Sequence, residues 1–256
     1  MRIVSLLENT AGRADVSAEH GLSLYIEACG RRILFDMGQT DLYAKNAERL
    51  GVRLADVELA VLSHGHYDHG GGLAAFHSLN MRAMIYRAPR AFFPRFNAMR
   101  KDISLDIAFA TSPRLIEVKK RTVIAPGLTL LPASIVPDPT DSGGLMTVER
   151  GKLVPDRFVD EQYLLIEEGG LRVLISGCSH RGVLAIAEAV RPDVLIGGFH
   201  LSKHPCDGAL QQTAEALAAL PTRYYTCHCT GEEQFAYMKQ FMPNLSYLAC
   251  GDSLTL

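Results

Sequence analysis

The residues best suited to chemistry lie in one short segment, His64-Gly-His-Tyr-Asp-His69. His64, His66, Asp68 and His69 offer three imidazoles and one carboxylate within six residues. At neutral pH such side chains suit zinc, iron or manganese. The segment follows the apolar stretch Leu59–Ser63, expected as a strand, and precedes three glycines that let the backbone bend tightly. The spacing therefore predicts one or two divalent transition metals, with zinc the favoured ion and iron or manganese the alternatives.

Three later segments end expected strands with further side chains that can bind metal. They are Ile175–Gly182 with Cys178 and His180, Ile196–Leu201 with His200, and Thr226–Gly231 with Cys227, His228 and Cys229. Six cysteines in 256 residues are too few for a disulfide scaffold. We expect reduced thiols that pack, bind metal or react.

The elements that must position these residues change in character along the chain. Strands are expected at Arg2–Leu7, Leu22–Ala28, Arg32–Phe35 and Leu59–Ser63, and a helix at Asp41–Leu50. Towards the end, strands at Tyr163–Glu167, Arg172–Ser176, Asp193–Ile196 and Arg223–Thr226 alternate with helices at Gly182–Val190, Gly208–Leu220 and Glu232–Phe241. Two strand-rich halves covered by helices favour an α/β fold, a four-layer αββα sandwich, over a doubly wound sheet.

We interpret residues 1–256 as a single domain. Residues 87–160 carry eight prolines and the loop Asp138–Gly144, and we expect a long irregular insertion there. Such an insertion in a compact domain is typical of a lid or substrate wall. The alternative is a surface excursion without a role.

Composition excludes several classes of protein. The chain has 26 basic and 28 acidic residues, a net charge of −2, and 48% hydrophobic residues. This balance excludes a disordered chain and argues against a nucleic-acid partner. No apolar stretch approaches the roughly 18 residues that span a bilayer, and the first residues lack a signal-peptide core. We therefore expect a soluble, cytoplasmic protein with no membrane partner.

The motif His64-x-His66-x-Asp68-His69 resembles the signature of the metallo-β-lactamase superfamily. That family has an αββα fold with metals at the shared edge of its sheets. Asp36, in Ile33–Gly38, resembles the family's supporting acid. The segments SGCSHRG, GGFHL and CHCTG, with Glu8-Asn-Thr10 and His20-Gly-Leu-Ser23, resemble a narrower subfamily. It includes the archaeal synthase that joins a dihydropterin to a ribofuranosylaminobenzene 5'-phosphate.

The resemblance implies roles for individual residues. His64, His66, Asp68 and His69 are metal ligands, and Asp68 also orients the nucleophile in catalysis. No histidine lies between His77 and His180, so His180 substitutes for the ligand usually found there.

Other positions match the family pattern less closely. His228 corresponds to the late ligand of the second metal. Cys178 stands where the family usually has a bridging aspartate, and His200 is a ligand, a substrate contact or a structural residue. His20 is expected in the active-site wall. Cys227 and Cys229 are interpreted as buried packing residues, and His77 and His204 as surface residues.

The segment from Arg82 to Lys101 contains six basic residues, no acid and three phenylalanines. One interpretation is a positive surface in which Arg90, Arg95 and Arg100 bind the phosphate of a ring-containing substrate. The other is a solvated helix face with phenylalanines in the core.

The sequence is consistent with three functions. The first is an enzyme acting on a small phosphorylated ring compound, as in the subfamily. The second is a general zinc-dependent hydrolase of esters, phosphoesters or lactones. The third is a metal-dependent sensor without turnover. All three need the same ligands, so the substrate-binding walls must distinguish them.

Overall fold

The computed structural model describes residues 1–256. Six strands of the first half and one from the C-terminal end build a seven-stranded mixed sheet. The strand order is β17 (Ser253–Thr255), β1 (Arg2–Leu7), β2 (Ser23–Ala28), β3 (Arg31–Phe35), β4 (Leu59–Val61), β5 (Met84–Arg87) and β7 (Leu115–Glu117). The β2–β3 hairpin turns at Cys29 and Gly30, which have φ of 52° and 70°. Two positive φ angles are typical of the tight turn that matches strand twist.

The second half builds another seven-stranded sheet. Its order is β16 (Leu245–Tyr247), β15 (Arg223–Thr226), β14 (Val194–Gly197), β13 (Leu171–Ile175), β12 (Gln162–Glu168), β9 (Leu128–Pro132) and β8 (Thr122–Ala125). β13 to β16 are parallel, as are β3, β4, β5 and β7 in the first sheet. The strands expected in both halves form, with ends that differ by one or two residues.

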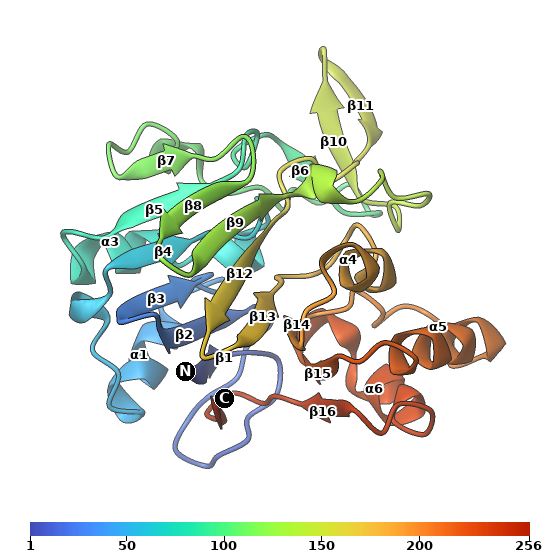
Figure 1. Ribbon diagram of the computed structural model, residues 1–256. Coiled ribbons are helices and arrows are strands. Elements are labelled where there is room, and N and C mark those ends of the chain that lie inside the picture. The colour runs from blue at the N-terminus through green and yellow to red at the C-terminus, as the bar shows by residue number, and fades with distance from the viewer.

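The two sheets pack face to face through an apolar layer that includes Ile33, Val61, Leu164 and Val194, all completely buried. Helices α1 (Leu42–Arg49) and α3 (Leu73–Leu79) cover the outer face of the first sheet. Helices α4 (Val183–Val190), α5 (Gly208–Ala218) and α6 (Glu232–Met238) cover the second (Figure 1). The fold is therefore the four-layer αββα sandwich that the sequence predicts. No helix is both long and apolar enough to cross a membrane.

Residues 87–160 are only partly irregular, because short strands interrupt the loops. This segment supplies β7, β8 and β9 to the two large sheets. It also forms a three-stranded sheet of β6 (Arg95–Phe96), β10 (Met146–Glu149) and β11 (Lys152–Pro155), which projects beside the sandwich (Figure 1). Frequent prolines obscured these strands because they lie at strand ends and turns. Short 3-10 turns occupy Leu54–Asp56, Ile107–Phe109, Ala133–Ile135 and His228–Thr230.

The carboxyl ends of the strands set the position of the site. β1, β3 and β4 end at one edge of the first sheet, and β13, β14 and β15 end at the matching edge of the second. Because the sheets face each other, the loops after these six strands meet. The predicted ligand loop leaves β4 and enters the single-turn helix α2 (Tyr67–Gly70).

Candidate metal centre

The loop from Ser63 to His69 is buried although most of its residues are polar. His64, His66, Asp68 and His69 are all less than 10% exposed. The loop passes close to a neighbouring segment at Gly65, where a Cβ would overlap the carbonyl oxygen of Ala91. Glycine is therefore required between the first two histidines.

His64, His66 and His180 form a first group of ligand atoms. His64 Nε2 lies 3.0 Å from His66 Nδ1 and 3.3 Å from His180 Nε2. His180 comes from the loop after β13, so the group joins the two sheets. Burial lowers the pKa of all three imidazoles well below the usual value, which favours the neutral form that binds metal.

Asp68, His69 and His228 form a second group beside the first. His69 Nε2 lies 3.2 Å from His228 Nε2, and Asp68 Oδ2 lies 3.3 Å from His228 Nε2 and 3.7 Å from His69 Nε2. Burial alone would raise the pKa of Asp68, but His69 and the hydrogen bonds from neighbouring imidazoles lower it well below the usual value. The carboxylate is therefore ionised, as a ligand requires.

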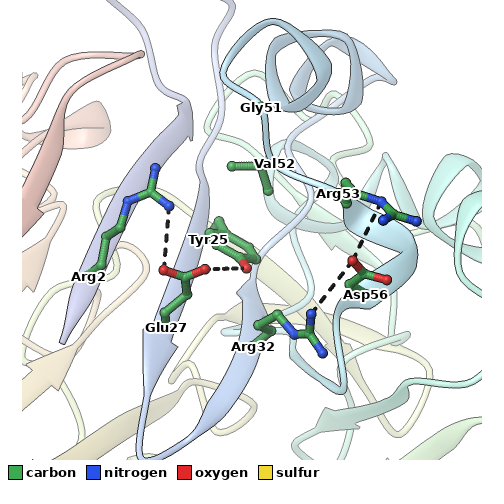
Figure 2. A pocket seen from close by; sticks show the side chains of 8 residues that line it. All are labelled: Arg2, Tyr25, Glu27, Arg32, Gly51, Val52, Arg53 and Asp56. Carbon is green, nitrogen blue, oxygen red and sulfur yellow. Dashed lines mark hydrogen bonds and ion pairs between the residues drawn. The ribbon is translucent and has the colours of Figure 1, made fainter.

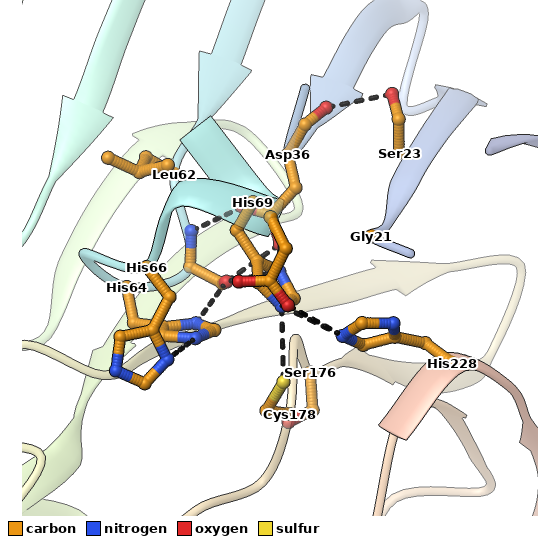
Figure 3. Close-up of polar contacts among 12 residues, drawn as sticks. Gly21, Ser23, Asp36, Leu62, His64, His66, His69, Ser176, Cys178 and His228 are labelled. Atoms are coloured by element: carbon orange, nitrogen blue, oxygen red, sulfur yellow. Dashed lines mark hydrogen bonds and ion pairs between the residues drawn. The ribbon is translucent and has the colours of Figure 1, made fainter. Parts of the chain in front are cut away.

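Cys178 lies between the two groups. Its Sγ is 3.1 Å from His69 Nε2, and it also lies within 4.8 Å of the ligand nitrogens of His64, His180 and His228. Figure 3 shows its thiol beneath His69, in the space that the imidazoles surround. Burial raises the pKa of this thiol well above the usual value. A bound cation would favour its thiolate.

These distances fit metal ions. Ligand atoms that share one ion at about 2.0–2.2 Å lie roughly 3–4 Å apart, as the atoms of each group do. Imidazole nitrogens and a carboxylate oxygen suit zinc, iron or manganese, and a thiolate favours zinc. The residues therefore fit two adjacent divalent ions, one in each group, with Cys178 able to reach both.

Asp36 orients one ligand from behind. Its Oδ2 lies 2.6 Å from His69 Nδ1, and Figure 3 shows the two side chains. Oδ2 also accepts a hydrogen bond from Ser63 Oγ at 2.7 Å, and Oδ1 accepts one from Ser63 N at 2.7 Å. Asp36 is completely buried at the end of β3. With His69 Nδ1 as the donor, Nε2 is left free to bind metal.

Glu8 and Asn9, at the end of β1, hold His228 in the same way. Asn9 Oδ1 lies 2.9 Å from His228 Nδ1, and the buried Glu8 accepts a hydrogen bond from His228 N at 3.1 Å. Asn9 Nδ2 also lies 3.4 Å from His20 Nδ1. The sequence marked this segment only through its resemblance to the subfamily, and it gave no role to either residue.

Two acids at the start of β12 support the loops. Asp160 Oδ2 accepts a hydrogen bond from Gly65 N at 2.7 Å, and Glu161 Oε1 accepts one from His180 N at 2.8 Å. Burial raises the pKa of Glu161 to about 7. Sequence reasoning missed both, because each acid accepts a hydrogen bond from a backbone N–H, Asp160 from a residue 95 positions earlier and Glu161 from one 19 positions later, and no side-chain spacing marks such contacts.

His20 and His200 lie at the border of the centre. His20 Nε2 is 3.1 Å from Asp68 Oδ2, and its side chain is 53% exposed. The ring of His200 lies 4.2 Å from that of His180, centre to centre. The interpretation of Cys229 as a packing residue alone is incomplete, since its thiol lies within 4.8 Å of Cys178 and His200. The 3-10 turn at His228 rotates Cys229 towards the site, which an extended strand would not.

The structure corrects the expectation of a positive surface from Arg82 to Lys101. Arg95 is 2% exposed, and its guanidinium forms ion pairs with Asp156 at 3.1 Å and Asp160 at 2.7 Å. Arg90 pairs with Glu149 at 2.9 Å, whereas Arg100 is exposed and unpaired. Acids from distant segments therefore neutralise much of this charge. Arg95 is a structural residue that a substrate cannot reach.

A charged pocket elsewhere on the protein also has its charges paired with one another. It has a volume of about 160 Å³ and lies where β1 and β3 begin, at the edge of the first sheet opposite the ligand loops. Figure 2 shows its side chains and their ion pairs. Its lining residues are Arg2, Tyr25, Glu27, Arg32, Gly51, Val52, Arg53 and Asp56. Each arginine pairs with an acid at 3.4–3.6 Å. No unpaired charge remains there for a ligand.

The family model of the metallo-β-lactamase superfamily matches residues 17–227. The chain belongs to the metallo-β-lactamase superfamily. A Methanocaldococcus jannaschii protein named 7,8-dihydropterin-6-methyl-4-(beta-D-ribofuranosyl)-aminobenzene-5'-phosphate synthase is 28% identical, over 98% of this chain and 95% of its own. The uncharacterised protein MJ0448 of the same organism is 27% identical, over 92% and 93% of the two chains.

A solved structure extends the likeness to the whole fold. Tm1679, described as a metal-dependent hydrolase of the β-lactamase superfamily, is 27% identical and aligns with a TM-score of 0.84. The alignment covers 100% of this chain and 99% of Tm1679. Zn(2+)-bound PqqB from Methylobacterium extorquens, at 15% identity and a TM-score of 0.61, shares the fold.

Proposed function

We propose that this superfamily member is an enzyme that holds one or two divalent transition metals, zinc in the first place, and acts on a small phosphorylated, ring-containing substrate. The observation that carries the proposal is the convergence of buried ligand atoms from both sheets. Their spacing of 3.0–3.7 Å within each group suits shared cations.

The candidate ligands would have distinct roles in binding metal and orienting the reactants. His64, His66 and His180 would hold one ion, and Asp68, His69 and His228 the other, with Cys178 between them. When bound, a divalent metal acts as a Lewis acid and lowers the pKa of water to about 7. Asp68 faces both His228 and the half-exposed His20, so it lies between the buried ligands and solvent. This position suits a carboxylate that orients the attacking group.

The relatives favour two reaction classes. The relative named as a synthase supports a transfer reaction. In the transfer that we propose, a pyrophosphate leaves a pterin-like methyl carbon with the C–O bonding electrons. An aromatic amine or its ring carbon forms the new bond and loses a proton. The description of Tm1679 supports hydrolysis of an ester, phosphoester or lactone instead.

The decisive experiment combines metal analysis with a product assay. Purified protein should contain one or two equivalents of metal. A dihydropterin pyrophosphate and an aminobenzene ribose phosphate should release pyrophosphate only when both are present. His69→Ala should lose the release and at least one equivalent of metal. Release without the amine supports the hydrolase, and tight binding without product supports the sensor. Protein without metal would refute the proposal.

A further inference from the structure

One cavity adjoins the metal centre and remains unassigned. It has a volume of about 430 Å³, within the range of roughly 300–1,000 Å³ that is usual for small-molecule sites. Its walls are the loop 139–143, the first turn of α4 and the loop 199–204. His180 and His200 belong to its lining, so the cavity opens beside the first group of ligands. A molecule that occupies it can reach the metal centre.

The first turn of α4 brings unpaired donors to this cavity. Gly182 is the residue that precedes the helix, and no side chain accepts a hydrogen bond from the first N–H groups of α4. The N–H of Ile186 bonds to the carbonyl of Gly182, whereas the N–H groups of Val183, Leu184 and Ala185 find no acceptor in the chain. Gly182, Val183 and Leu184 line the cavity. Free amides and the helix dipole favour an anion there.

Buried side chains supply independent evidence. Arg181 is 6% exposed, and its Nε has no hydrogen-bond partner. Its other nitrogens donate to the carbonyls of Val136 and Arg157 and pair with Asp138 at 2.7 Å. His180 is 7% exposed, and its Nδ1 is also unpartnered. Both residues line the cavity. Buried donors without a partner are uncommon in proteins, and an acceptor in the cavity would satisfy them.

The remaining lining suits a ring that carries a charged group. Phe158 and Phe199 contribute aromatic faces, and Phe158 stacks on His180 at 4.3 Å between ring centres. Thr140 and Ser142 add hydroxyl groups at the mouth. The acid in this wall, Asp141, accepts a hydrogen bond from Gly143 N at 2.9 Å. The cavity therefore pairs apolar surface with several donors.

We infer that this cavity binds the phosphomonoester group of the substrate, with the attached ring against the aromatic wall. A phosphate has three acceptor oxygens and about two charges, which match the free amides and Arg181 better than a carboxylate does. The inference rests on the proposed function. It places phosphate recognition in this cavity instead of at the arginines of the segment Arg82–Lys101.

Phenyl phosphate and phenol are the probes, titrated calorimetrically into the zinc-loaded protein. Thr140→Glu places a negative charge at the mouth, and we expect it to weaken phenyl phosphate binding about tenfold. Thr111→Glu makes the same change at an exposed threonine outside the cavity and should bind like the wild type. Phenol affinity should be equal in all variants.

A second variant tests the backbone. Proline is well accepted at the first position of a helix and lacks an N–H, so Val183→Pro removes one donor without adding charge. We expect a loss of roughly threefold to tenfold in phenyl phosphate affinity, with the thermal unfolding temperature showing that α4 remains folded.

Two results would overturn the inference. One is equal phenyl phosphate affinity in the wild type, Thr140→Glu and Val183→Pro. The other is binding that Thr140→Glu keeps and His69→Ala abolishes, because the phosphate would then lie on the metals. Metal content and turnover are measured on the same samples. Binding in the cavity without metal or product would count against the proposed function alone.

Discussion

Replacement of Asp36 tests whether a buried acid behind the ligands determines metal affinity. In Asp36→Asn, the amide oxygen can still accept from Ser63 N, but the amide nitrogen then faces His69 Nδ1, 2.6 Å away in the native protein. Two donors cannot face each other. His69 must therefore move or turn to the tautomer that carries its proton on Nε2, the atom that points into the second group.

The magnitude follows from this single contact. A hydrogen bond to a charged group contributes about 1.5–3 kcal/mol, whereas a neutral one contributes about 0.5–1.5 kcal/mol. The difference of about 1–2 kcal/mol corresponds to a loss of roughly 5–30-fold in affinity. Changes behind metal ligands typically cost about 10–100-fold. We therefore expect at least a tenfold weaker second metal in Asp36→Asn, and a larger loss in Asp36→Ala.

The assay is competition for zinc with a chromophoric chelator, combined with thermal unfolding. Asp156→Asn is the matched control, because Asp156 is also a buried acid but contacts Arg95 and Phe158 N rather than an imidazole. It should lower stability and leave zinc affinity unchanged. A folded Asp36→Asn protein that binds both zinc ions as tightly as the wild type would refute the reasoning.

Three further changes probe other parts of the structure. Asn9→Ala should weaken the second metal about tenfold by freeing His228 Nδ1, as chelator competition would show. Cys178→Ala should weaken zinc more than manganese, because thiolate favours zinc; equal losses in metal titrations would contradict this role. Arg95→Ala should cost about 3–5 kcal/mol in the free energy of unfolding, measured with urea, because it leaves two buried carboxylates unpaired. An unchanged urea midpoint would argue against it.

The sequence predicted what depends on local pattern. Stretches rich in Val, Ile and Leu predicted eight strands of the two large sheets, β1 to β4 and β12 to β15, and spacing within six residues predicted the loop from His64 to His69. Strand ends with a histidine also pointed to His180 and His228. These features could be predicted locally because the residue that follows a strand must lie at the sheet edge where that strand ends.

What the sequence could not reveal depends on partners far along the chain. Arg95 looks like a surface cation until Asp156 and Asp160, about sixty residues later, enclose it. Cys229 turns inward because a short 3-10 turn replaces the expected strand continuation. Glu161 accepts a hydrogen bond from the backbone N–H of His180, and the spacing of side chains in the sequence does not predict such a contact.

The site lies across the contact between the two sheets. Each group of ligand atoms takes residues from the loop after β4 and one histidine from the second sheet: His180 in the first group and His228 in the second. An ion in either group would therefore tie the sheets together above the apolar layer. That layer leaves little freedom to the ligands, since residues such as Val61, just before the loop, are completely buried. Differences in substrate preference should then arise from the loops 139–143 and 199–204, which line the cavity next to the candidate ligands His180 and His200.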